Sequence, residues 1–311
     1  MKRGIVLGLM IAVGALSLAV AGAQQGGGGG QPAPKVVEVQ KLKDNLYVLT
    51  GGGGNVSAFI TTSGVVVVDA KNPGWGQPLL DKIKTLTDKP VTILINSHTH
   101  GDHVSGNVEF PATVDIVTHI NTKSNMEKMI PNSTAQDQTR PAQTIFQANG
   151  GKGLPKRTFK DKMTIGSGND RVELFYFGRG HTDGDAWVLF PSLQVLHAAD
   201  IFSGKNVPLL DANNGGSAAE IGNTLQKAHD SFPTVTAIVT GHSTTASLAD
   251  LREYAAFNRE FLADVRAAKK AGKTVDEVAS TWKIPAKYAG YAEPAANRMK
   301  NNVQLVYNET K

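Results

Sequence analysis

The 311-residue chain contains no cysteine. This absence excludes disulfide bridges, thiolate metal ligands, cysteine nucleophiles and the cysteine of a bacterial lipoprotein anchor. The chain also lacks a GxSxG sequence, so the common serine-nucleophile pattern is missing. The formal net charge is +5, yet the basic residues do not cluster or alternate with aromatic residues, which argues against nucleic acid as a partner.

A long apolar run occurs only at the N-terminus. Lys2 and Arg3 precede an apolar stretch that ends at Val20, and Ala21-Gly22-Ala23 follows it. A charged start, an apolar centre and an AxA-like end predict a signal peptide over residues 1–23, with an uncleaved membrane anchor as the alternative. Glycine and proline predict a flexible leader over residues 24–35. We therefore expect a periplasmic or secreted protein that has no membrane span after signal cleavage.

The remaining chain is expected to form one domain over residues 36–250 and a helical extension over residues 251–311. With 41% hydrophobic residues the chain can bury a large core. Apolar alternation and continuous apolar runs predict strands at 36–40, 45–50, 56–61, 64–70, 91–95, 114–118, 163–165, 172–177, 186–190, 193–197 and 235–240. Helical spacing predicts helices at 75–86, 104–110, 121–129, 218–230, 247–272 and 293–306, and a capping box at 274–277 predicts a shorter one.

The stretch VTILINSHTHGDHVSGN at residues 91–107 has the clearest chemical content. An apolar strand ends there, and His98, His100, Asp102 and His103 follow within six residues. Side chains two apart in an extended segment point the same way, so His98 and His100 can bind one metal ion. Asp102 and His103, at the start of a helix, would serve a second position. Imidazole and carboxylate ligands without thiolate suit Zn²⁺ or a similar divalent ion.

Three further strand ends each carry a ligand-type residue: His181 in GRGHTDGDA, Asp200 in HAAD and His242 in TGHS. Carboxyl ends of strands converge at one edge of a sheet, which is the reason to group these residues with the 98–103 turn. Asp69 also ends a buried strand, where it could orient a metal-bound histidine or cap the next turn. His119 and His197 are interpreted as structural.

Two loops have open interpretations. The glycine run at residues 51–54 could be a plain turn or a mobile flap over a binding site. Residues 131–160 are polar and lack clear periodicity, so they could form a lid, packing or a partly disordered segment.

In these ordered motifs, HTHGDH, GRGHTDGDA, HAAD and TGHS, the chain resembles the metallo-β-lactamase-fold hydrolases over about residues 36–250. The resemblance implies an α/β fold, an αβ/βα sandwich of two mixed sheets flanked by helices, with 36–250 as the catalytic domain. It also implies two metal positions, with Asp200 bridging both. The implied ligands are His98, His100 and His181 for the first metal and Asp102, His103 and His242 for the second.

The chain departs from the best-known zinc β-lactamases at one ligand position. Asp200 stands where they carry a metal-binding cysteine, so the site is more similar to that of the thioester, lactone and phosphoester hydrolases of the superfamily. Ser243 follows His242 where relatives often have glycine, which adds a hydroxyl that the resemblance does not explain.

What the resemblance implies chemically is a binuclear zinc hydrolase acting on a small-molecule substrate. A metal-bridged hydroxide would attack an ester, thioester, lactone or β-lactam-type bond, while Asp102 orients the nucleophile and shuttles its proton. Two Zn²⁺ ions are expected, with iron or manganese as other possible metals. We consider Lys205 as a partner for a substrate carboxylate. The alternatives are an iron-loaded oxidoreductase of the same fold and a non-catalytic periplasmic metal-binding protein.

Overall fold

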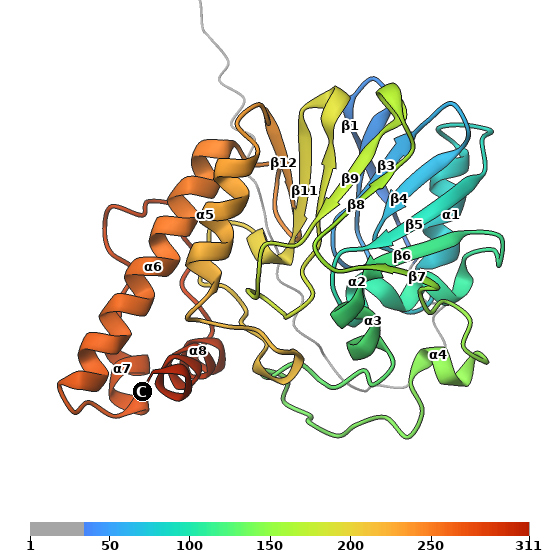
Figure 1. Ribbon diagram of the computed structural model, residues 1–311. Coiled ribbons are helices and arrows are strands. Elements are labelled where there is room, and N and C mark those ends of the chain that lie inside the picture. Colours follow the sequence, from blue (N-terminus) through green and yellow to red (C-terminus); the bar gives the residue numbers. More distant parts are fainter. Residues whose placement is uncertain (1–33, 311) are drawn as a thin grey trace, which may run out of the picture. The chain divides into compact units, whose positions relative to one another are not determined.

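Two mixed β-sheets face each other in the computed structural model, which describes residues 34–310 (Figure 1). The prediction of a signal peptide at 1–23 lies outside the described residues, as does most of the leader. The first sheet has the strand order β1 (Glu38–Lys43), β2 (Leu46–Thr50), β3 (Val56–Ile60), β4 (Val65–Val68), β5 (Val91–Asn96), β6 (Asp115–His119) and β7 (Arg157–Phe159). Strands β1 to β4 are antiparallel neighbours, whereas β4 to β7 run parallel.

The second sheet has five strands. Their order across the sheet is β12 (Ala237–Thr240), β11 (Val195–Ala199), β10 (Trp187–Phe190), β9 (Val172–Phe175) and β8 (Lys162–Ile165). Only the β11–β12 pair is parallel. In both sheets, therefore, a parallel part brings several strand carboxyl ends to the same edge.

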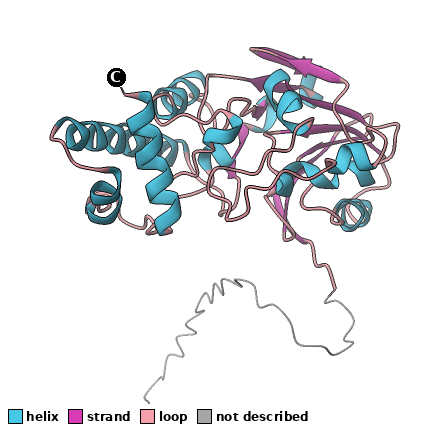
Figure 2. Ribbon diagram, turned by 90° about the horizontal axis from the view of Figure 1, so that it is seen from below, coloured by secondary structure: helices cyan, strands magenta, loops and turns pink. Residues whose placement is uncertain are grey.

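Apolar side chains alternate along the strands and fill three layers. On β4, Val66 and Val68 face the core between the two sheets, whereas Val65 and Val67 pack toward helix α1 (Gly76–Lys84). The outer face of the second sheet is covered by α5 (Ile221–Ser231), α6 (Leu248–Lys270) and α8 (Ala296–Glu309). Figure 2 shows helices on both sides of the strands. The predicted αβ/βα sandwich of two mixed sheets is confirmed.

Three shorter helices lie between strands, namely α2 (Gly101–Val104), α3 (Ile120–Met126) and α4 (Ile145–Ala148), and a 3₁₀ turn (Ser105–Glu109) continues α2. A fourth, α7 (Val275–Thr281), lies between α6 and α8. The helix expected from residue 104 begins at Gly101 instead, because His100 is extended and serves as its N-cap residue. The predicted capping box of α7 is present, with Thr274 and Glu277 bonded to each other's backbone.

The helices after residue 250 share the core of the second sheet. Helix α6 starts at Leu248, before the domain boundary expected after residue 250. Residues 35–310 form one compact unit. Met299, Val303 and Val306 of α8 are buried in the same apolar cluster as Trp187 of β10. Across residues 34–310, every helix is either too short or too polar to span a membrane.

Candidate metal centre

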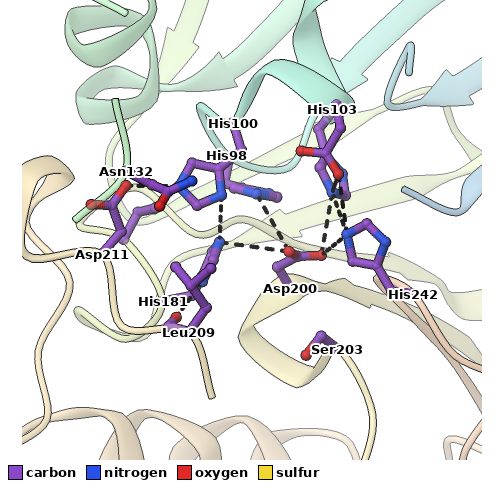
Figure 3. A network of polar contacts seen from close by, with 12 residues as sticks. His98, His100, His103, Asn132, His181, Asp200, Ser203, Leu209, Asp211 and His242 are labelled. Atoms are coloured by element: carbon purple, nitrogen blue, oxygen red, sulfur yellow. Dashed lines mark hydrogen bonds and ion pairs between the residues drawn. The ribbon is translucent and has the colours of Figure 1, made fainter. Parts of the chain in front are cut away.

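Seven ligand-type side chains, all of those expected from the sequence, lie together at one edge of the two sheets (Figure 3). They come from the segments that follow β5, β9, β11 and β12. In each of two groups the ligand atoms lie within 4.8 Å of one another, and these groups are His98, His100, His181 and Asp200, and Asp102, His103 and His242. Residues separated by more than a hundred positions thus meet because parallel strands end side by side.

The first group presents three imidazole rings to one point. His181 Nε2 lies 3.0 Å from His100 Nδ1 and 3.7 Å from Asp200 Oδ2. His98 Nε2 is 4.0 Å from Asp200 Oδ2. Within residues 34–310, the buried atoms His98 Nε2 and Asp200 Oδ1 have no hydrogen-bond partner. Buried polar atoms without partners are costly. A cation in the first group would satisfy His98 Nε2, and one in the second group would satisfy Asp200 Oδ1, which faces that group.

The second group shares the Asp200 carboxylate with the first. Asp200 Oδ1 lies 3.2 Å from His103 Nε2 and 3.3 Å from His242 Nε2. Asp102 Oδ2 is 3.2 Å from His242 Nε2 and 3.6 Å from His103 Nε2. In Figure 3, Asp200 lies between His98 and His181 on one side and His103 and His242 on the other. Its two oxygens therefore face different groups.

Each buried histidine is oriented through its other ring nitrogen. His103 Nδ1 is 2.7 Å from Asp69 Oδ2, and His98 Nδ1 is 3.0 Å from Ser97 Oγ. Ser97 in turn donates to Asp69 from both its backbone nitrogen and its hydroxyl. Of the two roles considered for Asp69, the structure shows contact with a ligand histidine. Such partners fix the ring and its tautomer.

Two orienting groups come from a segment whose role was not predicted. His100 Nε2 lies 2.7 Å from Asp211 Oδ2, and His181 Nδ1 donates to the Leu209 carbonyl at 2.6 Å. Both partners precede the Asn-Asn-Gly-Gly turn at 213–216, in a stretch without periodic pattern. No local sequence signal marks them, because their role depends on tertiary contact.

Burial and neighbouring carboxylates decide which histidines of the site are charged. Burial, together with His103, holds the pKa of His98 well below its ordinary value, and burial lowers the pKa of His181 to about 4. At His103 burial is outweighed by three nearby carboxylates, which hold its pKa well above the ordinary value. At His242 burial is likewise outweighed by the adjacent carboxylates of Asp102 and Asp200, and the pKa rises to about 9.

The pKa values of Asp102 and Asp200 are lowered, opposite to those of His103 and His242. Burial alone would raise the pKa of Asp102, but the charge of His103 and a hydrogen bond from His242 lower it to about 2. The same two histidines outweigh burial at Asp200 and hold its pKa well below the ordinary value. Anionic oxygens beside imidazole nitrogens form a donor set that suits Zn²⁺.

Two glycines allow the ligands to approach the backbone. A Cβ atom at Gly241 would lie 1.9 Å from Asp200 Oδ1, and one at Gly54 would lie 2.1 Å from the His103 ring. Neither distance is possible without displacing the ligand. The glycine before His242 and the last glycine of the 51–54 run therefore fit the metal centre closely.

A hollow of about 540 Å³ lies over the two groups. Its floor includes His100, Asp102, His181, Asp200 and His242. The remaining lining combines apolar and polar side chains, namely Thr99, Gly101, Met129, Ile130, Pro131, Asn132, Ala135, Ser203, Asn206, Leu209 and Arg298. The start of the 131–160 segment therefore forms part of the wall, and its backbone is fixed where Ser133 N donates to Asp211.

A second hollow, of about 450 Å³, reaches His242 and is lined by the glycine run through Gly51 and Gly53. Ser243 also lines it, while its carbonyl accepts from Asn55 and Thr240.

The two histidines interpreted as structural make hydrogen-bond contacts away from the ligand groups. His119 accepts from Asn121 N, and His197 Nδ1 is 2.8 Å from Ser57 Oγ.

The structure does not bring Lys205 into the hollow over the ligands. Its ammonium lies 2.9 Å from Asp250 and 3.2 Å from Glu253, on the side of helix α6. It would have to leave both carboxylates to meet a substrate. The expected pairing of Lys205 with a substrate carboxylate thus stays a prediction without geometric support.

Comparisons with known proteins agree with this geometry. The family model described as the metallo-beta-lactamase superfamily matches residues 49–262. A metallo-beta-lactamase type 2 from Elizabethkingia meningoseptica is 30% identical over 233 residues, covering 68% of this chain and 81% of the relative. A hydroxyacylglutathione hydrolase from Nostoc punctiforme is 26% identical over 172 residues, covering 55% and 52%.

The solved structure of a metallo-beta-lactamase from Pontibacter korlensis superposes with a TM-score of 0.57 at 20% identity. The superposition covers 72% of this chain and 99% of that one. The family match extends over more than half of the sequence and includes every ligand-type residue of the site. The chain belongs to the metallo-beta-lactamase superfamily.

Proposed function

We propose that the protein is an exported, zinc-dependent hydrolase with a binuclear centre, acting on an ester, thioester, lactone or β-lactam-type bond of a small molecule. The observation that carries the proposal is the sharing of Asp200 by two adjacent ligand groups, through Oδ2 on one side and Oδ1 on the other. A single carboxylate between two sets of donors is the arrangement that holds two cations close together.

The seven ligand side chains would hold two divalent ions. His98, His100 and His181 would bind the first, and Asp102, His103 and His242 the second, with Asp200 between them. Bound zinc would supply Lewis acidity to water and to the substrate oxygen that gains charge. Zinc is proposed because the donors are imidazole and carboxylate only, in a chain without thiolates.

Asp102 is the side chain best placed to act on the attacking water. It lines the hollow, and its carboxylate is 29% exposed, whereas the side chains of His98 and His103 are at most 1% exposed. With its pKa near 2, the carboxylate is ionised at neutral pH and can accept a hydrogen bond from water. It would orient the nucleophile and then pass its proton to the leaving group.

Export is proposed from the N-terminal pattern of charge, apolar run and small residues. Sequencing the N-terminus of protein recovered from the periplasm or medium would test it. A mature chain that starts near residue 24 is expected, whereas recovery of the intact chain in membranes would contradict export.

The test of activity is a substrate panel applied to the zinc-loaded mature chain. Chromogenic β-lactam, lactone, thioester and ester substrates are compared for the wild type, Asp102→Asn and His181→Ala. Hydrolysis of at least one class is expected, with a loss of about a hundredfold or more in Asp102→Asn. Undiminished hydrolysis in both variants would refute the proposed site. Oxygen consumption with bound iron would point instead to an oxidoreductase, and tight metal binding without turnover to a metal-binding protein.

A further inference from the structure

Arg298, on helix α8, is the only lysine or arginine among the residues that line the hollow over the metal ligands. It lies 36 positions beyond residue 262, where the family match ends. Arg298 therefore lies outside the part of the chain that the family model matches. Its charge faces a space whose floor carries the proposed reacting centre.

The guanidinium of Arg298 is not neutralised by a neighbour. No ion pair joins it to a carboxylate of residues 34–310, whereas Arg179 pairs with both Glu220 and Glu309. Its side-chain contact is a long one, 3.5 Å from Nη1 to the Val207 carbonyl. A half-buried guanidinium keeps most of its N–H donors available in a planar fork, which suits a carboxylate or another oxyanion.

The position of Arg298 is fixed by its own helix. Asn301 and Asn302, on α8, donate to the carbonyls of Leu210 and Pro208, each at 2.8 Å. These carbonyls flank Leu209, which lines the hollow and orients His181. Buried Met299 and Val303 hold α8 against the core. The helix that carries Arg298 is thus bonded to the segment whose Leu209 carbonyl orients His181.

The rest of the wall completes a pattern for an amphipathic ligand. Met129, Ile130 and Leu209 give the hollow an apolar surface. Asn206 adds a polar amide to the wall, and it precedes Val207, whose carbonyl contacts Arg298. The carboxylates that line the hollow, Asp102 and Asp200, belong to the floor. An anion at Arg298 would therefore be recognised apart from the bond that reacts.

We propose that Arg298 binds a non-reacting carboxylate of the substrate, and that the substrate carries this group on an apolar arm. The inference rests on the proposed function and deepens it, because it names the substrate class of the same site. Arg298 is a specificity residue in this scheme, since it contacts the substrate away from the bond that is cleaved.

The test is a binding measurement that does not need turnover. Titration calorimetry compares 4-phenylbutyrate with the neutral 4-phenylbutyramide on the zinc-loaded mature chain. The wild type is expected to bind the carboxylate about ten- to a hundredfold more tightly than the amide, which is the range for a charge-assisted hydrogen-bonded pair. Arg298→Gln is expected to remove this preference, and Arg298→Lys to restore it in part, because lysine keeps the charge without the fork.

Lys300→Gln is the matched control. Lys300 lies on the same helix and pairs with Asp276 outside the hollow, so its loss removes one positive charge without changing the wall. It is expected to leave the preference unchanged. Zinc content and the circular dichroism spectrum establish that the Arg298 variants are folded and loaded.

The outcomes separate this inference from the proposed function. A carboxylate preference that survives in Arg298→Gln, or that falls equally in Lys300→Gln, would overturn the role of Arg298, for example because the metals alone bind the anion. A preference that depends on Arg298 supports the inference even if no substrate of the panel is hydrolysed. Hydrolysis with an unchanged preference in Arg298→Gln would refute the inference alone.

Discussion

The buried ligand histidines of this protein are oriented by the contact that each makes through the ring nitrogen facing away from the centre. His98 and His103 are held by Ser97 and Asp69, so that each ring presents Nε2 to the centre. Asp200 reaches both groups because its oxygens point in different directions. In the metal-free chain two of these histidines, His98 and His181, are neutral, whereas His103 and His242 carry a proton.

Zinc binding at the second group is expected to release protons. Without metal, the pKa of His103 lies well above its ordinary value and that of His242 is about 9, so both rings are charged at pH 7.5. The lowered pKa values of His98 and His181 leave those rings neutral. Calorimetry of the metal-free chain in two buffers of different ionisation enthalpy should give about two protons released on full loading. Release of none would contradict these charges.

The raised pKa of His242 also predicts how the stability of the metal-free fold changes with pH. The folded pKa of His242 lies above its unfolded value, so its charge stabilises the metal-free fold below the unfolded pKa, and this contribution is lost as the pH rises through about 9. Denaturant unfolding between pH 6 and 9.5 should show the fall. Replacement of His242 by Gln should flatten it.

Asp211→Asn is expected to weaken the first metal position. The carboxylate holds His100 through Nε2, and loss of such an orienting partner costs about ten- to a hundredfold in metal affinity. Competition with a chromophoric chelator would measure it. Asp183→Asn is a suitable control because Asp183 contacts Asn125 on α3 instead of a ligand histidine. Equal affinities in Asp211→Asn and the wild type would exclude the orienting role.

Strands and their ends explain how much of the site could be predicted. Apolar runs mark β5, β11 and β12, and a ligand residue follows each, so the site residues were predictable from strand ends. The start of α2 at Gly101 was not predictable, because its N-cap residue, His100, makes no side-chain capping bond. No sequence pattern indicated that Asp211 or Arg298 lies at the site, because the residues they contact, His100 and Val207, are distant in the sequence.

The turn after β12 is expected to tolerate no side chain at its first residue. Gly241→Ala would place a methyl group against Asp200 Oδ1 and the Ala199 backbone. The result should be a loss of zinc at both positions and a destabilisation of about 1–3 kcal/mol, the usual range for a forced overpacked contact. Thermal unfolding and metal analysis would measure both. Gly101→Ala, whose nearest neighbour is the Ser105 hydroxyl at 3.2 Å, is the control expected to change little.

The compact unit extends beyond the part of the chain that the superfamily model matches. Residues 35–310 form one compact unit, although the match ends at residue 262. Helix α8 contributes Met299, Val303 and Val306 to the core of the second sheet and Arg298 to the wall of the hollow. The C-terminal helices therefore belong to the core of the fold and contribute to the site.

Removal of residues 293–311 is expected to destabilise the entire unit. The deletion exposes the apolar surface that α8 covers on α6, and it removes the side-chain bonds to Pro208 and Leu210. Chemical unfolding of the shortened chain should show a lower midpoint for a single transition. An unchanged midpoint would indicate that α8 is an independent appendage.

The most direct test of the binuclear centre is anomalous diffraction at the zinc edge from crystals of the zinc-loaded mature chain. Two peaks are expected, one among His98, His100 and His181 and one among Asp102, His103 and His242, with Asp200 in contact with both. A single peak, or peaks away from these side chains, would contradict the account.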